Sequence, residues 1–336
     1  MKVSELGEFG LIDLLAEMAS GTRDSRTASW QQLLIGIGDD AAAWRGDASV
    51  QLATVDTLVQ DVHFSLGTAS WSEVGWRAMA ANLSDIAAMG GIPGYALVSL
   101  ALPRTTEMDD VADLYRGMIE LAQQAGVVII GGDISGAPLV VITITVLGST
   151  KSGDKRVLTR SAVEPGEQVA VTGYLGTSAA GLEMLSKQLQ FDPETTASLR
   201  NAFLHPRPRI AEGQLLVDQG VKAAIDISDG LVADIKQLCK ASQVGARIEI
   251  DSVPIQPMVK ANFGERALEM ALSGGEDYEL LFTGSAEVID RVKRAAPCPV
   301  TVIGEITADE AGRIIMVDRE GHPFNLRKAG WEHFTK

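Results

Sequence analysis

The sequence predicts an α+β fold that is divided into two domains. The chain has 336 residues, and two domains fit this length because a compact domain typically has about 100–200 residues. Patterns typical of strands and of helices mix in both halves without the regular alternation of a doubly wound parallel sheet, which favours the α+β class. Between Gly148 and Gly166 the composition turns polar and basic. We therefore expect one domain over residues 1–150 and a second over residues 151–336.

The expected elements of the first half follow from residue spacing and from terminal residues. Apolar side chains recur at helical spacing from Phe9 to Met18, which predicts a helix. Ser72 is the expected N-cap of an alanine-rich helix, and Thr106 and Asp109 have capping-box spacing at the start of another. The expected helices are 8–18, 72–88 and 106–124, and the expected strands are 50–55, 95–102, 127–130 and 139–147.

The second half shows the same mixture of elements. Runs rich in β-branched residues predict strands at 168–172, 246–250, 300–303 and 313–317. Helical spacing predicts helices at 178–189, 209–219, 231–241 and 286–295. His205-Pro206-Arg207-Pro208 reads as a rigid connection between elements, because proline fixes its backbone and donates no hydrogen bond.

Composition excludes several classes of protein. The net charge is −15, whereas a nucleic-acid-binding surface would show a basic patch. The two cysteines, Cys239 and Cys298, have no paired spacing, so neither a disulfide framework nor a zinc site is indicated. The first residues lack the pattern of a signal peptide, and no apolar run reaches the length of a membrane span. We expect a cytoplasmic protein that binds neither nucleic acid nor membrane.

Acidic residues in glycine-rich turns are the main chemical signal. The run from Ala224 to Gly230 places Asp226, Ser228 and Asp229 between an apolar strand and a helix. The same pattern of an acidic residue near small residues and glycine recurs at Asp39/Asp40, Asp56, Asp85, Asp133 and Glu276/Asp277. Carboxylates are ligands for Mg²⁺ or Ca²⁺, glycine lets a phosphate approach the backbone, and gathered acids repel one another unless cations neutralise them.

This pattern predicts a metal-phosphate site. Gly176 to Gly181 has the glycine spacing of a phosphate loop but lacks the lysine. Bound Mg²⁺ is therefore the expected means of holding a polyphosphate on this acidic protein. Each turn taken alone would more often be structural, because Asp-Gly and Gly-Gly-Asp are ordinary turn sequences. His63 and Trp331 alone would likewise more often be packing residues, so the prediction depends on the joint occurrence.

In this order along the chain, these segments resemble the motifs of thiamine-monophosphate kinases. The matching stretches are Ile37-Gly-Asp-Asp-Ala-Ala42, Asp56-Thr-Leu-Val59 with His63-Phe64, Asn82-Leu-Ser-Asp-Ile-Ala-Ala-Met-Gly90, Gly131-Gly-Asp133, Leu158-Thr-Arg-Ser161, Ile225-Asp-Ile-Ser-Asp-Gly230 and Ser273-Gly-Gly-Glu-Asp-Tyr-Glu-Leu280.

The resemblance implies the fold of aminoimidazole ribonucleotide synthetase, with an N-terminal mixed-sheet domain that forms homodimers and a C-terminal α+β domain that closes the cleft. It also implies the last step of thiamine diphosphate biosynthesis. ATP would phosphorylate thiamine monophosphate by direct in-line transfer with the help of several Mg²⁺ ions. No general base is expected, because a phosphomonoester has a second pKa of about 6 and is largely dianionic at neutral pH.

The resemblance assigns roles to particular residues. The implied metal ligands are Asp40, Thr54, Val55, Asp56, Asp85, Asp133, Asp226 and Asp229. Family members read Ser-Thr-Asp where this chain has Thr54-Val55-Asp56, and because Val55 has no hydroxyl, only its backbone carbonyl can bind metal there. The implied ATP contacts are Tyr115, Gly132, Asp133, Arg160 and Ser228, and the implied contacts to thiamine phosphate are His63, Glu276 and Trp331.

Two kinds of alternative remain open. One is another member of the same superfamily, such as aminoimidazole ribonucleotide synthetase or selenophosphate synthetase. The latter would need a reactive cysteine near a glycine-rich N-terminal turn, whereas both cysteines lie in the second half. The other alternative is a non-catalytic module that binds a divalent ion or a nucleotide. Such a module would keep the acids but would need no acceptor pocket with His63, Glu276 and Trp331.

Overall fold

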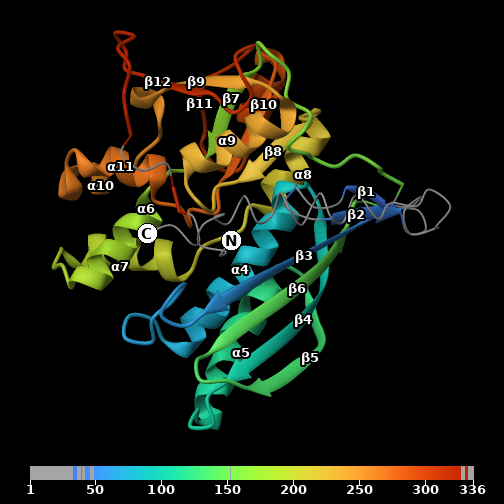
Figure 1. Cartoon of the computed structure of the whole chain (residues 1–336), viewed down its shortest axis with the longest axis vertical. Helices are drawn as coiled ribbons and strands as arrows, with labels where there is room; N and C mark the ends of the chain where they lie inside the picture. The colour runs from blue at the N-terminus through green and yellow to red at the C-terminus, as the bar shows by residue number, and fades with distance from the viewer. Residues whose placement is uncertain are drawn as a thin grey trace, which may run out of the picture.

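Two six-stranded sheets form the framework of the protein (Figure 1). The computed structural model describes residues 33–35, 39, 42–45, 49–151, 153–326 and 330–331. The first sheet has the strand order β1-β2-β3-β6-β4-β5 and the second has the order β12-β9-β11-β7-β10-β8. Figure 1 shows the second sheet above the first, with helix α4 running up toward the upper half. The expected helix at 8–18 lies outside the described residues.

The first sheet is mixed, because β4 and β5 pair in parallel and its other neighbours are antiparallel. Helices α4 (Trp71–Ala88) and α5 (Met108–Gln124) pack against each other, and both contact this sheet. Ala96, Val98 and Leu100 of β4 are fully buried. The strands are β1 (Leu33–Ile35), β2 (Ala42–Arg45), β3 (Val50–Val59), β4 (Ile92–Leu102), β5 (Val128–Gly136) and β6 (Val141–Ser149).

The other face of the first sheet exposes apolar side chains. Alternate residues of a strand point to opposite faces, so Tyr95 and Leu97 of β4 point away from the helices and are exposed. Val55 of β3 and Val128 of β5 are more than half exposed. These side chains make the outer face of the first sheet partly apolar.

The second sheet is also mixed, since β9 and β12 pair in parallel and the other pairs are antiparallel. Its strands are β7 (Gln168–Thr172), β8 (Ala223–Asp226), β9 (Gly245–Glu249), β10 (Leu280–Gly284), β11 (Val300–Thr307) and β12 (Ile314–Val317). Its helices are α6 (Thr177–Lys187), α7 (Pro193–Leu204), α8 (Ile210–Gln219), α9 (Leu231–Ser242), α10 (Pro257–Phe263), α11 (Arg266–Ser273) and α12 (Ala286–Ala295), with a 3₁₀ turn at Ile250–Ser252. The predicted α+β class is confirmed.

Helix α4 joins the two halves. It contacts α5 and β3 on one side and α7, α8 and β8 on the other. Gly213 of α8 lies against α4 so closely that a Cβ atom there would come within 2.0 Å of the Ala87 carbonyl oxygen. Ala88 at the end of α4 belongs to the same apolar cluster as Leu216 and Phe282. Close packing therefore fixes how the two sheets face each other.

Several expected element boundaries were wrong. The N-cap of α4 is Ser70, which forms a reciprocal capping box with Glu73, and not Ser72. Helix α5 begins after Glu107 without a side-chain cap bond, so the expected capping box at Thr106 and Asp109 does not form. Strand β3 continues past Asp56 because it pairs with β6 from Gln51 to Val59. Helices α7, α10 and α11 were not predicted.

The largest difference lies in β5. A buried strand at 127–130 followed by a glycine turn was expected. Instead β5 runs through Gly131-Gly132-Asp133, and most of its residues are exposed, because it is the edge strand of the sheet.

Within the described residues, no helix combines the length and apolar character needed to cross a membrane.

Candidate active site

A cavity of about 700 Å³ lies where the first sheet and α4 meet the loops of the second half. Both halves contribute to its wall. The wall includes eight residues that the sequence singled out, namely Asp56, His63, Asp85, Asp226, Ser228, Asp229, Glu276 and Trp331. The structure thus brings together acids from four segments that are widely separated along the chain.

Strand β3 and helix α4 position the acids of the first half. Thr54 and Asp56 follow the alternation that points side chains of β3 toward α4. The Thr54 hydroxyl donates to Oδ2 of Asp85 over 2.5 Å. The backbone N–H of Asp56 donates to Oδ1 of Asn82 over 3.1 Å. These bonds fix the strand against the helix, so Asp56 and Asp85 face the same cavity.

The loop after β8 contributes the acids of the second half. Asp226 ends the strand and is only 2% exposed. Its carboxylate accepts a hydrogen bond of 2.7 Å from the hydroxyl of Ser84 on α4, and one of 3.4 Å from the hydroxyl of Ser228. The Ser84 bond ties the two halves together at the cavity. A buried carboxylate needs such donors, because burial removes its hydration.

Asp234 on α9 holds the backbone of the same loop. Its carboxylate accepts the backbone N–H groups of Asp229 and Gly230 over 3.2 and 3.0 Å at the start of α9. Burial raises the pKa of Asp234 well above its ordinary value, and the charges of Asp229 and Asp226 raise it further. Asp234 does not line the cavity, so its place is to hold the Asp229 backbone.

The segment before β10 carries side chains to two sides. Glu276 and Tyr278 have left-handed backbones, with φ of 55° and 51°, and both line the cavity. Burial, followed by the charge of Glu276, raises the pKa of Tyr278 well above its ordinary value. Their N–H groups donate to Ser228 and Ile227 carbonyls over 2.7 and 2.9 Å. Residues other than glycine adopt this backbone rarely. The two hydrogen bonds stabilise it here and hold the segment against the Asp226 loop.

The alternate residues of this segment line a smaller cavity on the far side. Asp277 accepts the N–H groups of Gly176 and Ser178 at the start of α6, over 2.8 and 3.4 Å. Burial raises the pKa of Asp277 to about 8, although these two backbone hydrogen bonds lower it. Glu279 forms an ion pair with Arg209 over 2.5 Å. Asp277, which the sequence grouped with the metal-phosphate turns, is thus a capping residue.

Arg77 is a cavity residue that the sequence analysis missed. It is 2% exposed, lies on α4 and lines the cavity. Its guanidinium forms an ion pair with Glu276 and donates two hydrogen bonds of 3.3 Å to the carbonyl of His63. The ring of Phe203 lies 4.2 Å from the Arg77 Cζ atom. No motif marks a single arginine in an alanine-rich helix, so only its contacts reveal it.

Other expected site residues lie away from the cavity wall. Val55 points to the exposed face of the first sheet. Arg160 donates its backbone N–H to the Asp39 carboxylate and forms an ion pair with it over 3.7 Å. Tyr115 is half-buried on α5, and burial raises the pKa of its hydroxyl. Gly132 and Asp133 lie on edge strand β5, and Asp40 lies outside the described residues.

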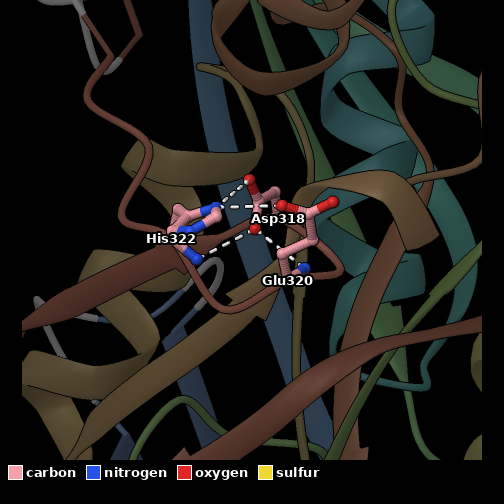
Figure 2. A group of neighbouring side chains, drawn as sticks. All are labelled: Asp318, Glu320 and His322. Carbon is pink, nitrogen blue, oxygen red and sulfur yellow. Dashed lines mark hydrogen bonds and ion pairs between the residues drawn. The ribbon is translucent and has the colours of Figure 1, made fainter.

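One further group of possible metal ligands lies near the end of β12. Asp318, Glu320 and His322 bring one ligand atom each within 4.8 Å of the others (Figure 2). The Asp318 carboxylate accepts the backbone N–H groups of Glu320 and His322, each over 2.9 Å. These bonds lower the pKa of Asp318. They account for the cluster as an exposed turn that its aspartate stabilises.

Comparison with known proteins agrees with this arrangement. Residues 38–150 match the N-terminal domain family of AIR synthase related proteins, and residues 164–317 match the corresponding C-terminal domain family. Thiamine-monophosphate kinase from Escherichia coli K12 is 38% identical and covers 98% of each chain. The enzyme from Bacillus subtilis 168 is 37% identical, over 92% of this chain and 96% of that protein.

Solved structures lead to the same family. The structure of AaThiL complexed with AMPPCP and TMP superposes with a TM-score of 0.85 at 32% identity and covers 99% of both chains. Similarity of this extent in sequence and in fold spans both halves that form the cavity. The chain belongs to the thiamine-monophosphate kinase family.

Proposed function

We propose that the protein is a kinase that transfers a phosphoryl group from ATP to thiamine monophosphate and releases thiamine diphosphate and ADP. Its relatives bear the corresponding name. The observation that carries the proposal is the shared cavity. Acids from both halves line it together with His63, Glu276 and Trp331. Such a wall suits the divalent cations that accompany a polyphosphate and the thiazolium cation of the acceptor.

The chemistry needs no basic side chain. A phosphate oxygen of thiamine monophosphate attacks the γ-phosphorus of ATP. The bond between that phosphorus and the oxygen bridging to the β-phosphate breaks, and its electron pair leaves with ADP. The attacking phosphate has a second pKa of about 6 and is already largely dianionic at neutral pH. The protein therefore has to orient two polyanions and to reduce their repulsion.

The acids of the cavity fit Mg²⁺. They offer only carboxylate oxygens, which this ion prefers. Asp226 is nearly fully buried, and gathering it with Asp56, Asp85 and Asp229 without cations would be costly. We assign Mg²⁺ to these four residues, with Asp40, Thr54 and the Val55 carbonyl as further ligands. When bound, Mg²⁺ would neutralise charge on the transferring phosphoryl group.

The remaining cavity residues divide between the two substrates. Ser228 follows Asp226 in the same loop and is assigned to ATP phosphates, with Arg160 as a second contact. His63, Glu276 and Trp331 are assigned to thiamine monophosphate. Trp331 is 46% exposed at the cavity wall, where its ring offers a face to the thiazolium cation.

A second protomer would complete the site. Tyr115, Gly132 and Asp133 are assigned to ATP, and Asp133 to metal as well, yet none of them lines the cavity. Asp133 pairs with Ser99, then Thr143, then the cavity residue Thr57, on successive strands. Three strand spacings put it roughly 14 Å from Thr57. We propose that the exposed apolar face forms a homodimer and brings Asp133 of each protomer to its partner's cavity.

The proposed division of the chain is residues 1–150 and 151–336. The first sheet ends at Ser149 and the second begins at Gln168, which supports a boundary in the basic segment between them. The proposed location is the cytoplasm, because ATP is supplied there.

The direct test incubates the purified protein with ATP, Mg²⁺ and thiamine monophosphate and separates the products by chromatography. We expect equal amounts of thiamine diphosphate and ADP, and loss of both when a chelator removes Mg²⁺. Consumption of ATP only with a different acceptor would instead favour another member of the superfamily. ATP binding without turnover on any acceptor would favour the binding-module alternative.

A further inference from the structure

Arg77 connects four segments of the cavity that lie far apart in the sequence. It belongs to α4, and its partners are the His63 carbonyl after β3, the Phe203 ring on α7 and the Glu276 carboxylate before β10. All four residues line the cavity. Arg77 is 2% exposed, and burying a charged guanidinium is unfavourable unless an opposite charge and hydrogen bonds compensate for the lost hydration. In the part of the chain that the structure describes, Glu276 is its one carboxylate partner.

Glu276 needs this partner to hold its position. Its backbone is left-handed and follows Gly275, where a Cβ atom would come within 2.5 Å of the Ser228 carbonyl oxygen. The Glu276 side chain remains 32% exposed, whereas that of Arg77 is buried. One carboxylate oxygen accepts from the buried guanidinium, which leaves the other able to face the cavity. The planar fork of arginine suits this task, because it holds a carboxylate in a defined orientation.

The same guanidinium also fixes His63. Two of its N–H groups converge on the His63 carbonyl oxygen, and the His63 ring accepts the Val59 N–H at Nδ1 over 3.0 Å. Backbone and ring of His63 are thus both held. The two residues assigned to the acceptor from different halves of the chain, His63 and Glu276, share one buried cation between them.

We propose that Arg77 is a positioning residue for the acceptor substrate, which it serves by orienting Glu276 and His63 toward the thiazolium end of thiamine monophosphate. This inference rests on the proposed kinase function and adds a residue to it. In this role Arg77 acts through Glu276 and His63 and not through the reacting phosphates. The thiazolium end lies away from the transferred phosphoryl group. Losing contacts to it therefore weakens the binding of the substrate and of the transition state equally. The effect should therefore appear in KM for thiamine monophosphate and leave kcat and the KM for ATP nearly unchanged.

The test is a double-mutant cycle with Arg77→Met, Glu276→Gln and the double variant. If Arg77 acts through Glu276, each single substitution raises the KM for thiamine monophosphate about tenfold, and the double variant is no worse than the poorer single variant. Multiplication of the two effects in the double variant would show that Arg77 acts on the substrate independently and would overturn the inference. So would an unchanged KM in folded Arg77→Met.

A matched control separates positioning from stability. Arg200 on α7 forms an ion pair with Glu73 of α4 over 2.6 Å, and neither residue lines the cavity. Arg200→Met should lower the melting temperature without changing either KM. Arg77→Lys provides a conservative variant should Arg77→Met fail to fold. Because lysine keeps the charge but lacks the planar fork, its KM should lie between those of the wild type and Glu276→Gln, and a wild-type KM would contradict the inference.

The two levels of the proposal fail in different ways. If the wild-type protein produced no thiamine diphosphate, the kinase function would be wrong, and the positioning role would fall with it. If the wild type were active and the cycle additive, the kinase function would stand and only the role of Arg77 would be wrong.

Discussion

The hydrogen bond from Ser84 to Asp226 provides the sharpest test of how the two halves build the site. Ser84 is fully buried on α4, and its hydroxyl donates to the Asp226 carboxylate over 2.7 Å. Hydrogen bonds to charged groups contribute about 1.5–3 kcal/mol. Ser84→Ala removes the donor and leaves Asp226 buried. We therefore expect the free energy of unfolding to fall by about 1.5–3 kcal/mol.

A second buried serine gives a matched control. Ser178 on α6 is 1% exposed, and its hydroxyl has no hydrogen-bond partner among the described residues. Ser178→Ala removes the same atom from a similar depth but breaks no bond. Its free energy of unfolding should be unchanged or should rise, because an unsatisfied buried polar group is unfavourable.

Two assays follow this comparison. Urea denaturation at pH 7 gives the free energies of unfolding of both variants. A titration of kinase activity with Mg²⁺ then asks whether Ser84 also orients Asp226 for metal. We expect Ser84→Ala, and not Ser178→Ala, to need several-fold more Mg²⁺ for half-maximal activity. Equal losses of stability in the two variants, or an unchanged Mg²⁺ requirement in Ser84→Ala, would refute the reasoning.

Three further predictions concern the dimer and the pH dependence. Asp133→Asn and Asp226→Asn should each abolish activity without loss of fold, and coexpression of the two chains should restore about a quarter of it through mixed dimers; no recovery would mean that Asp133 acts within its own protomer. Leu97→Asp should yield monomers in analytical ultracentrifugation, whereas Met108→Asp on exposed α5 should leave the dimer intact. Folded Asp277 keeps its proton up to about pH 8, whereas the ordinary pKa is 3.8, so the free energy of unfolding should fall as pH rises between these values, by up to about 1.4 kcal/mol per pH unit. Asp277→Asn cannot titrate and should show a flatter profile between pH 6 and 8; parallel profiles would contradict this pKa.

Local signals in the sequence predicted elements that stand on their own. Strand β7 and helix α12 begin and end at the expected residues. The N-cap of α12 is Ser285, whose hydroxyl accepts the Val288 N–H. Neighbouring residues alone supply the cap and the apolar spacing in such elements, so no distant contact is needed to recognise them.

Features that depend on distant partners were missed. Gly131-Gly132-Asp133 has the composition of a turn, yet it pairs with β4 as a strand. A Cβ atom on Gly132 would come within 1.7 Å of the Val98 carbonyl oxygen, so close approach of strands explains this glycine. The motifs likewise identified the acids. They did not show that Asp133 lies at the sheet edge and the others at the cavity, because that depends on the strand order.

The segment from Gly275 to Tyr278 links a proposed acceptor contact to two proposed metal ligands. Three of its residues have left-handed backbones, and for ordinary residues this conformation costs on the order of 1–3 kcal/mol each. The cost is offset by the N–H groups of Glu276 and Tyr278, which bond to the loop that carries Asp226 and Asp229. Hydrogen bonds therefore join Glu276, which we assign to the acceptor, to the loop that carries the proposed metal ligands Asp226 and Asp229. A change that relaxed this strain would therefore shift Glu276, Asp226 and Asp229 together.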